Sequence, residues 1–292
     1  MNKSNSSAFL LNTSKLKLSN LEFKRLSDLV QRQTGIRMPQ AKKVMLESRL
    51  QKRLRQLRIP TFSEYLQYLF SAQGKSEELL NMIDAVTTNK TDFFREPFHF
   101  NFLKMSLLPA LVNRYQSPPK LTVWSAACSS GEEPYTLAMV LEDFKEKNPK
   151  LNYSIYATDI STQVLDIAKK GIYAEERIAP VPPALKFKYL LKSKDRIKKE
   201  VRIHPSLRSK ISFSRLNLLE SPYSIREKMD IIFCRNVFIY FDRETQLFIL
   251  NQFYKHLKPG GFLFMGHSES LNGLDIPYVQ IRPTIYRKAL SK

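Results

Sequence analysis

The sequence has little cysteine, little glycine and no long run of apolar residues. Its two cysteines, Cys128 and Cys234, are too few for a disulfide framework, and they cannot form a structural zinc site without histidine ligands. Its longest apolar runs, such as residues 8–11, fall far short of the ~20 residues that a membrane span needs. The first twenty residues also lack the ~7 to 15 apolar residues of a secretory signal. We therefore expect a cytoplasmic chain with no membrane insertion and with both cysteines as thiols.

Histidine is scarce as well, and its distribution argues against a metal site. The four histidines are His99, His204, His256 and His267, and they are scattered without the spacing that is typical of metal ligands. We therefore predict that no metal is bound.

Basic residues are in clear excess over acidic ones. There are 47 Lys and Arg against 27 Asp and Glu, which gives a formal net charge of +20. Such an excess suits nucleic acid, an anionic membrane surface or an acidic protein partner, and composition alone does not choose among them. The hydrophobic fraction of 43% is too high for a disordered chain, and 292 residues allow one large or two modest domains.

The first hundred residues contain the start signals of helices. Ser19 and Thr61 each stand three residues before a glutamate, the capping-box pattern in which hydroxyl and carboxylate both satisfy unpaired backbone N–H groups. Gly35 is a suitable stop for the first helix. Between the two boxes, residues 42–58 place leucines on one side of a helix and basic residues around the rest. This pattern predicts helices that include a basic amphipathic one.

Beyond residue 120, short β-rich runs alternate with helical patterns. The expected strands cover residues 121–127, 153–158, 211–218, 230–234, 262–266 and 284–287. The expected helices cover residues 133–145, 161–170 and 243–257. This alternation predicts parallel strands joined by right-handed crossovers, which is the doubly wound α/β class. The last two strands have no helix between them and should form an antiparallel pair at one edge.

One segment, residues 186–215, interrupts the alternation. It carries eleven Lys or Arg against Asp195 and Glu200, and apolar and polar residues alternate over 201–204. We interpret it as a small basic β insertion, and a solvated hairpin is the alternative.

In an open α/β sheet, ligands bind beyond the carboxyl ends of the strands, where the strand order reverses. The first strand is followed by a turn of small residues and by Glu132 and Glu133 at the start of a helix. This is not a G-x-G-x-x-G loop, and two carboxylates are poorly suited to a pyrophosphate at that helix terminus. They suit a ligand that carries positive charge, or they merely complement the helix dipole.

Two further strand ends carry residues suited to a nucleoside. Asp159 follows the second strand, where a carboxylate can accept from both hydroxyls of a ribose, and it could also cap the next helix. Asn236 and several aromatic residues follow the strand at 230–234 and form a lip for adenine or substrate, or simply packed core. Adenine, ribose and a cationic end together describe S-adenosylmethionine better than NAD.

Four motifs resemble those of the chemotaxis receptor methyltransferases of the CheR type. They are, in chain order, TNKTDFFRE at 88–96, WSAACSSGEEPY at 124–135, FCRNVFIYFD at 233–242 and GHSE at 266–269. The resemblance extends from about residue 19 to residue 287. It implies a protein-glutamate O-methyltransferase that uses S-adenosylmethionine, yields S-adenosylhomocysteine, and has a Rossmann-like class I methyltransferase sheet.

The resemblance also implies how the chain is divided. The expected parts are a flexible tail at 1–18, a helical domain at 19–88, a linker that reaches the active site at 89–120, and a methyltransferase domain at 121–292 with an antiparallel β subdomain at about 172–212. In some members of the family that subdomain holds a pentapeptide from the receptor.

Site residues follow from the same resemblance, position by position. The implied cofactor-binding residues are Asn89, Thr91, Arg95, Glu133 at the methionine part, Asp159 at the ribose, Asn217, Leu218, Asn236 and Val237. Arg95 and Tyr240 would lie nearest the transferred methyl group. A glutamate with a pKa near ~4.3 is already ionised at neutral pH, so the displacement needs no base. We therefore assign Arg95 to hold the carboxylate and Tyr240 to support it, and His267 has no proton to remove.

The implied partner is the cytoplasmic helical domain of a chemotaxis receptor, which would recruit a monomeric enzyme to membrane receptor arrays. The basic helix at 42–58 is suited to dock an acidic receptor helix. The docking residues would be Arg49, Arg53, Arg55 and Arg58. Alternatively, its basic side chains merely cover apolar surface.

Two other functions are compatible with this fold class. A nucleic-acid methyltransferase would use the positive charge, but no Asp/Asn-Pro-Pro-Tyr/Phe motif follows the strand at 230–234, and we expect no nucleic-acid partner. A non-catalytic module that senses S-adenosylmethionine would bind the cofactor without transferring the methyl group.

Overall fold

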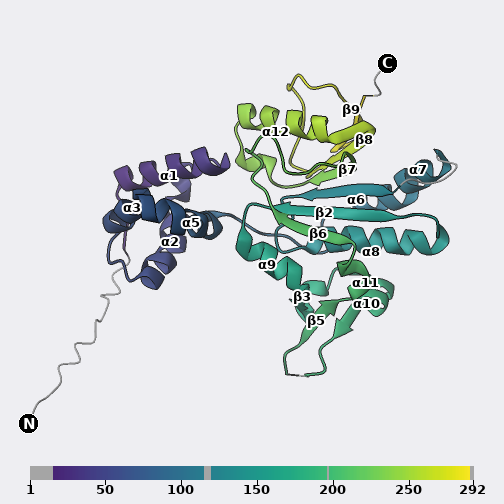
Figure 1. Ribbon diagram of the computed structural model, residues 1–292, viewed down its shortest axis with the longest axis horizontal. Helices are drawn as coiled ribbons and strands as arrows, with labels where there is room; N and C mark the ends of the chain where they lie inside the picture. Colours follow the sequence, from purple (N-terminus) through teal and green to yellow (C-terminus); the bar gives the residue numbers. More distant parts are fainter. Residues whose placement is uncertain (1–15, 115–119, 196, 290–292) are drawn as a thin grey trace, which may run out of the picture. The chain divides into compact units, whose positions relative to one another are not determined.

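The computed structural model describes residues 16–114, 120–195 and 197–289 (Figure 1). The chain forms two compact units, divided between Thr87 and Thr88. Most of the expected tail at 1–18 and part of the expected linker at 89–120 lie outside the described residues. Within the described part of the chain, no helix is both long and apolar enough to cross a membrane.

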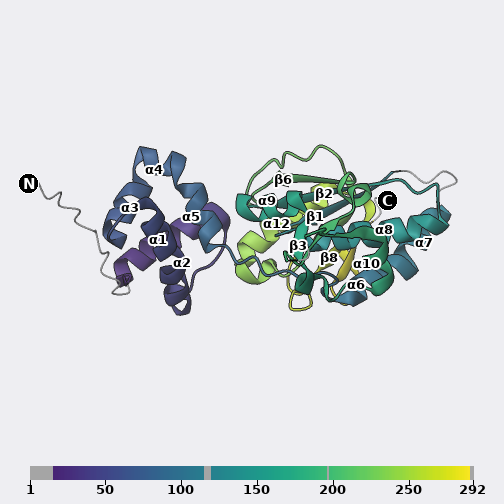
Figure 2. The same cartoon turned by 90° about the horizontal axis from the view of Figure 1, so that it is seen from below.

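The first unit consists of helices (Figure 2). They are α1 (Asn20–Thr34), α2 (Lys43–Leu57), α3 (Phe62–Phe70), α4 (Ala72–Glu77) and α5 (Leu79–Val86). Ser19 forms the predicted capping box with Glu22, and Thr61 accepts the backbone N–H of Glu64. The predicted stop at Gly35 is confirmed, with a φ of 74°. The amphipathic helix predicted at 42–58 is also confirmed, because α2 buries Leu46, Leu50 and Leu54 in the core of this unit.

A buried ion pair ties α2 to the rest of the helical unit. Arg53 donates to both carboxylate oxygens of Glu78, at 2.9 Å and 2.5 Å, and Glu78 is 1% exposed. Tyr65 donates to the same carboxylate at 3.0 Å. Arg49 donates to the backbone carbonyls of Val86 and Thr87 at 2.6 Å and 2.7 Å. Two of the four arginines assigned to docking therefore already hold this unit together.

Replacing Arg53 with methionine should lower the free energy of unfolding by about 2 kcal/mol, because the buried Glu78 carboxylate would lose its cationic partner and keep neutral donors only. The loss is smaller than the ~3–5 kcal/mol of a fully buried pair because the Arg53 side chain is 16% exposed. Arg55→Met is the matched control on the exposed side of α2 and should change stability by less than ~0.5 kcal/mol. Urea unfolding of the full chain, followed by circular dichroism, measures both, and equal losses would contradict a structural role for Arg53.

The second unit is built on a seven-stranded sheet with the strand order β6-β2-β1-β7-β8-β10-β9. Its strands are β1 (Leu121–Ala126), β2 (Tyr153–Asp159), β6 (Ile211–Arg215), β7 (Met229–Cys234), β8 (Leu257–Met265), β9 (Tyr278–Arg282) and β10 (Ile285–Lys288). The strands from β6 to β8 are parallel, and β10 is antiparallel to both β8 and β9. The central strands β1 and β7 are buried at every position, as expected when both faces of a sheet are covered.

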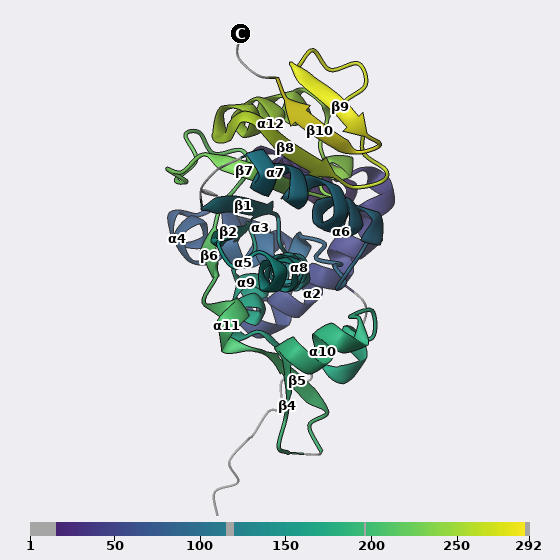
Figure 3. The same ribbon diagram turned by 90° about the vertical axis from the view of Figure 1, so that its right-hand side faces the viewer.

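Helices cover both faces of this sheet. From β1 through β2 to β6 the chain moves in one direction by way of α8 (Glu132–Lys147) and α9 (Thr162–Lys170), and from β7 to β8 it moves the other way by α12 (Arg243–His256). Because such crossovers are right-handed, α12 lies on the face opposite α8 and α9. Figure 3 shows α12 across the sheet from α6 (Pro97–Phe102) and α7 (Leu108–Arg114), which are joined by η2 (Leu103–Leu107). The predicted doubly wound α/β fold is confirmed.

A three-stranded antiparallel sheet is inserted between α9 and β6. Its order is β3-β5-β4, with strands β3 (Ile172–Ala174), β4 (Leu190–Lys192) and β5 (Glu200–Ile203). The insertion also contains η3 (Glu175–Ile178), α10 (Pro183–Tyr189) and α11 (Pro205–Arg208). Figure 2 shows α10 beside α8, where Lys188 binds Glu146 at 2.6 Å. The predicted antiparallel β subdomain is confirmed, although its first strand precedes the basic segment at 186–215.

Candidate active site

The strand order of the main sheet reverses between β1 and β7, and the carboxyl ends of these strands mark the ligand site of an open α/β sheet. Beside β1, strand β2 ends at Asp159, which is buried. The Asp159 carboxylate accepts the backbone N–H of Ser129 at 2.8 Å and that of Ser161 at 2.9 Å. It thus holds the turn after β1 against the end of β2, and the residue that caps α9 is Ser161.

The turn after β1 has no room for a side chain at its last position. Gly131 has a φ of 98°, and a Cβ there would lie 2.9 Å from both the Ala168 Cβ and the Tyr173 hydroxyl. Ala127 and Ser129 also have positive φ values, 60° and 50°. The small residues of this motif therefore permit a tight left-handed turn at the N-terminus of α8, where a ligand can approach the backbone closely.

A buried arginine at the end of β7 joins two acidic residues. The Arg235 side chain is 3% exposed and contacts Glu133 Oε2 at 3.2 Å and Glu96 Oε2 at 3.1 Å, and it also donates to the Arg95 carbonyl. Ser125 on β1 donates to the other Glu133 oxygen at 2.7 Å. Burial raises the pKa of Glu133 against the opposing effect of Arg235, whereas for Glu96 the effect of burial is outweighed and Arg235 lowers the pKa. Two acids and one cation leave this part of the sheet edge with a net charge of −1.

Arg95 precedes Glu96 in the chain, and its side chain, unlike that of Arg235, is not enclosed between two acids. The residue is partly exposed, and its guanidinium donates from Nη1 to the Lys90 carbonyl at 3.1 Å in an exposed hydrogen bond. Within the part of the chain that the structure describes, Arg95 forms no ion pair with a carboxylate. Phe94 and Glu96 on either side of it have φ values of 54° and 57°, so the local backbone is held in an uncommon conformation. Arg95 is thus a fixed cation that retains capacity to bind an anion.

Glu269 of the GHSE motif shapes the loop that follows β7. It is buried, and its carboxylate accepts four backbone N–H groups, those of Gly266, Asn236, Val237 and Phe238, at 2.6–3.0 Å. Asn236 has a φ of 60°, which this grip stabilises. Burial nevertheless raises the pKa of Glu269, against the effect of those hydrogen bonds. Glu269 therefore fixes the backbone positions of Asn236 and Val237.

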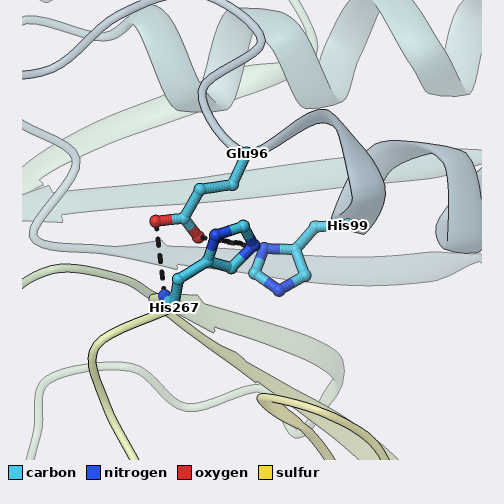
Figure 4. A group of neighbouring side chains, drawn as sticks. All are labelled: Glu96, His99 and His267. Atoms are coloured by element: carbon cyan, nitrogen blue, oxygen red, sulfur yellow. Dashed lines mark hydrogen bonds and ion pairs between the residues drawn. The ribbon is translucent and has the colours of Figure 1, made fainter.

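Glu96 also faces two histidines (Figure 4). Its Oε2 lies 3.5 Å from His99 Nδ1 and 3.8 Å from His267 Nε2. The His267 backbone N–H donates to Glu96 Oε1 at 3.3 Å. His99 is fully buried, whereas the His267 side chain is 57% exposed.

Hydrogen bonds and ion pairs connect many of the residues assigned from the sequence. Ser129 links Asp159 to the Asn89 carbonyl, and Arg235 links Glu133 to Arg95. Asn236 donates from Nδ2 to Glu96 Oε1 at 3.2 Å, and the Thr91 carbonyl accepts from Arg177. Asn217 and Leu218 follow β6, Val237 follows Asn236, and Tyr240 is the last residue of η4 (Phe238–Tyr240).

Three residues that organise this edge were not assigned from the sequence. Arg235 and Glu96 lie inside the motifs quoted above, but the sequence did not indicate their roles. Arg177 on η3 donates to the Thr91 carbonyl at 2.7 Å and to Glu132 at 2.5 Å, which connects the inserted subdomain to the 88–96 segment. Nothing local in the sequence indicates these pairings, because each partner is distant along the chain.

The donor and acceptor groups at this edge fit S-adenosylmethionine. The buried Arg235 Nε makes no hydrogen bond with any residue that the structure describes and could serve an anionic group such as a carboxylate. The Glu133 side chain is 12% exposed next to the tight turn, and the Asp159 carboxylate has remaining acceptor capacity for hydroxyl groups. The net charge of −1 suits a ligand whose sulfonium and amino groups are positive.

Two family models together match nearly the whole described chain. The CheR methyltransferase SAM binding domain matches residues 89–286, and the CheR methyltransferase all-alpha domain matches residues 21–87.

Curated relatives match over almost their full lengths. A chemotaxis protein methyltransferase of Escherichia coli is 40% identical over 98% of this chain and 96% of the relative. One from Borreliella burgdorferi is 39% identical over 91% of this chain and 94% of the relative, and chemotaxis protein methyltransferase 2 of Pseudomonas aeruginosa is 38% identical over 92% and 93%. The chain therefore belongs to the CheR methyltransferase family, the S-adenosylmethionine-dependent methyltransferases of chemotaxis.

Proposed function

We propose that this enzyme methylates glutamate side chains in the cytoplasmic helical domain of chemotaxis receptors and forms glutamate methyl esters. The observation that carries the proposal is the contrast between two neighbouring arginines. Arg235 is buried and paired with Glu96 and Glu133, whereas Arg95 is half-buried and donates to a backbone carbonyl. Arg95 is therefore suited to receive the carboxylate of an incoming substrate as a forked donor.

Ester formation on a carboxylate matches the acid–base character of this edge. A glutamate substrate is ionised at neutral pH, so no side chain has to remove a proton. The carboxylates of Glu96, Glu133 and Asp159 already accept hydrogen bonds from the protein, which suits positioning better than base catalysis. The substrate carboxylate oxygen would accept the methyl group that bound S-adenosylmethionine supplies, and the sulfur would keep the electron pair of the broken carbon–sulfur bond.

Each proposed site residue has one task in this reaction. Bound S-adenosylmethionine supplies a methyl carbon on a positive sulfonium. Glu133 would hold its methionine part and Asp159 its ribose, and the adenine and reaction centre would be lined by Asn89, Thr91, Asn217, Leu218, Asn236 and Val237. Arg95 would hold the substrate carboxylate in line, with Tyr240 as a second donor. Alignment of this kind can supply ~7 to 11 kcal/mol of the rate enhancement.

A labelling experiment tests the reaction. The full-length enzyme is incubated with S-adenosylmethionine labelled on the methyl group and with cytoplasmic fragments of chemotaxis receptors. We expect label on the receptor fragment and its release as volatile methanol under mild base, as a methyl ester requires. A receptor fragment with its labelled glutamates replaced by alanine is the control. Base-stable label, or label that persists on the alanine fragment, would rule out glutamate esters.

We further propose that the exposed arginines of α2 dock the receptor and thereby recruit a monomeric enzyme to membrane receptor arrays. Arg53 is held by Glu78, so Arg55 and Arg58 are the pair to test. Arg55→Glu with Arg58→Glu should raise the KM for receptor about tenfold, or ~1.4 kcal/mol, through charge repulsion with an acidic helix. Cofactor affinity should not change.

The control for docking places the same charge change elsewhere on the helical unit. Lys24→Glu with Lys75→Glu makes an equal change in net charge on α1 and α4. The effect of the arginine pair should also shrink as salt rises. An unchanged KM in the Arg55 and Arg58 variant, or an equal rise in the control, would show that these arginines are solvent-exposed side chains with no docking role.

A further inference from the structure

Glu96, His99 and His267 form a group of neighbouring side chains, and His99 also contacts Thr284. Thr284 donates its hydroxyl hydrogen to the Pro283 carbonyl at 2.7 Å, so its oxygen must accept from His99 Nε2 at 2.8 Å. A neutral imidazole with its proton on Nε2 has a lone pair on Nδ1.

The lone pair on His99 Nδ1 faces a lone pair of a Glu96 carboxylate oxygen. His99 Nδ1 lies 3.5 Å from Glu96 Oε2, and both atoms are buried. Glu96 Oε2 is ion-paired with Arg235 at 3.1 Å, whereas His99 Nδ1 has no hydrogen-bond partner among the described residues. Two acceptors at this distance repel each other unless a positive group lies between them. A bridging water would hold its two acceptors about 4.5 Å apart at normal hydrogen-bond lengths. Ligands of a tetrahedral metal, with bonds of about 2.1 Å, are about 3.4 Å apart, which is close to the observed separation.

A third ligand atom completes the group. His267 Nε2 lies 3.8 Å from the same Glu96 oxygen, and one ligand atom from each of the three residues lies within 4.8 Å of the others. Figure 4 shows the carboxylate and both rings turned toward one another. We propose that Glu96, His99 and His267 form a binding site for a divalent transition-metal ion of the zinc class.

The ligand types and the local charge favour this ion. Two imidazoles and one carboxylate are typical zinc ligands, and three protein ligands leave a fourth position for water. The exposed His267 gives the ion a route from solvent. Arg235, 3.1 Å from Glu96 Oε2, would occupy the other lone pair of that oxygen as a supporting donor, and the net charge of Glu96, Glu133 and Arg235 before the ion enters is −1. The site depends on neither the receptor nor the methylated residue.

The test uses the metal ion alone on the full-length protein. Protein stripped of metal is titrated with Zn²⁺ in competition with a chromophoric chelator, and Co²⁺ then serves as a spectroscopic probe. His267→Ala removes an exposed ligand without opening the core, and His204→Ala removes a histidine of the inserted subdomain as the matched control. We expect one tight zinc site in the wild type and in His204→Ala, each with the strong visible absorption of four-coordinate Co²⁺.

Loss of a residue that only supports a metal ligand lowers affinity ~10 to 100-fold, so His267→Ala, which removes a ligand, should weaken zinc binding at least ~100-fold and abolish the Co²⁺ absorption. Zinc binding that is unchanged in His267→Ala, equally weakened in His204→Ala, or absent from the wild type would overturn the proposal.

Discussion

Replacing Arg235 with leucine should weaken cofactor binding by ~100-fold or more and reduce methyl transfer by a larger factor. Arg235 is the cation that both Glu96 and Glu133 share, and all three side chains are at most 12% exposed. Removing one member of a buried charged group leaves the others uncompensated, at a cost of about 3–5 kcal/mol. Part of that cost would be met by protonation of Glu133, whose pKa burial already raises. A protonated or displaced Glu133 could no longer hold a positive ligand group.

The same substitution should also misplace Arg95, because Arg235 holds the Arg95 carbonyl. The measurements are calorimetric titration with S-adenosylhomocysteine, initial rates of receptor methylation, and thermal unfolding of each variant. Arg235→Lys is the matched control that keeps the charge. A lysine is a single point donor that cannot reach both acids and the carbonyl together, so it should fold like the wild type and show intermediate affinity. Wild-type affinity in Arg235→Leu would show that the group does not organise the cofactor site.

The parallel part of the fold could be predicted because its strands and helices differ in local pattern. Strands β1 and β7 are short, mostly apolar runs, and α12 has the N-cap Asp242, which accepts from the Thr245 backbone N–H. The helix ends at His256, and the Pro-Gly-Gly sequence that follows lies within β8. Strand β9 was not predicted. Its residues are mostly exposed at the sheet edge, so pairing with β10 rather than burial defines it.

The inserted subdomain shows a second limit of local patterns. Its first strand, β3, is three residues long and pairs with β5 across more than twenty residues of intervening chain. The helices α10 and α11 are short, and each begins at a proline, which was not taken as a start signal. These elements are fixed by contacts with the rest of the unit, such as that between Lys188 and Glu146.

The site residues follow the same division. Asp159 and Glu133 could be assigned because strand ends and helix starts are visible in the sequence. Arg235 could not, since an arginine after a strand is more often exposed than buried, and only its packing against Glu96, Glu133 and the ring of Phe100 keeps it inside. Likewise, His99 and His267 are remote from each other in the sequence and meet only because α6 and the loop after β8 converge.

Replacing Arg95 with alanine should reduce methyl transfer to receptor by ~10³-fold or more while cofactor affinity stays within about tenfold, a window of ~1.4 kcal/mol. Arg95 differs from Arg235 in its surroundings, because it is partly exposed and its guanidinium donates to the Lys90 carbonyl in an exposed hydrogen bond. Its loss leaves no buried acid without a partner, so we expect little change in thermal stability. What it removes is the forked donor that we assign to hold the substrate carboxylate in line with the methyl group.

The two arginine variants should therefore differ in cofactor binding, although both lose turnover. Arg95→Ala should bind S-adenosylhomocysteine and lose turnover, whereas Arg235→Leu should lose both. Arg95→Lys keeps the charge without the fork and should recover only part of the rate, since a point charge does not fix the orientation of a carboxylate. Single-turnover rates at saturating cofactor separate the chemical step from binding. Wild-type turnover in Arg95→Ala would show that Arg95 takes no part in the reaction. Full recovery of the rate in Arg95→Lys would show that Arg95 contributes by charge attraction and not by alignment.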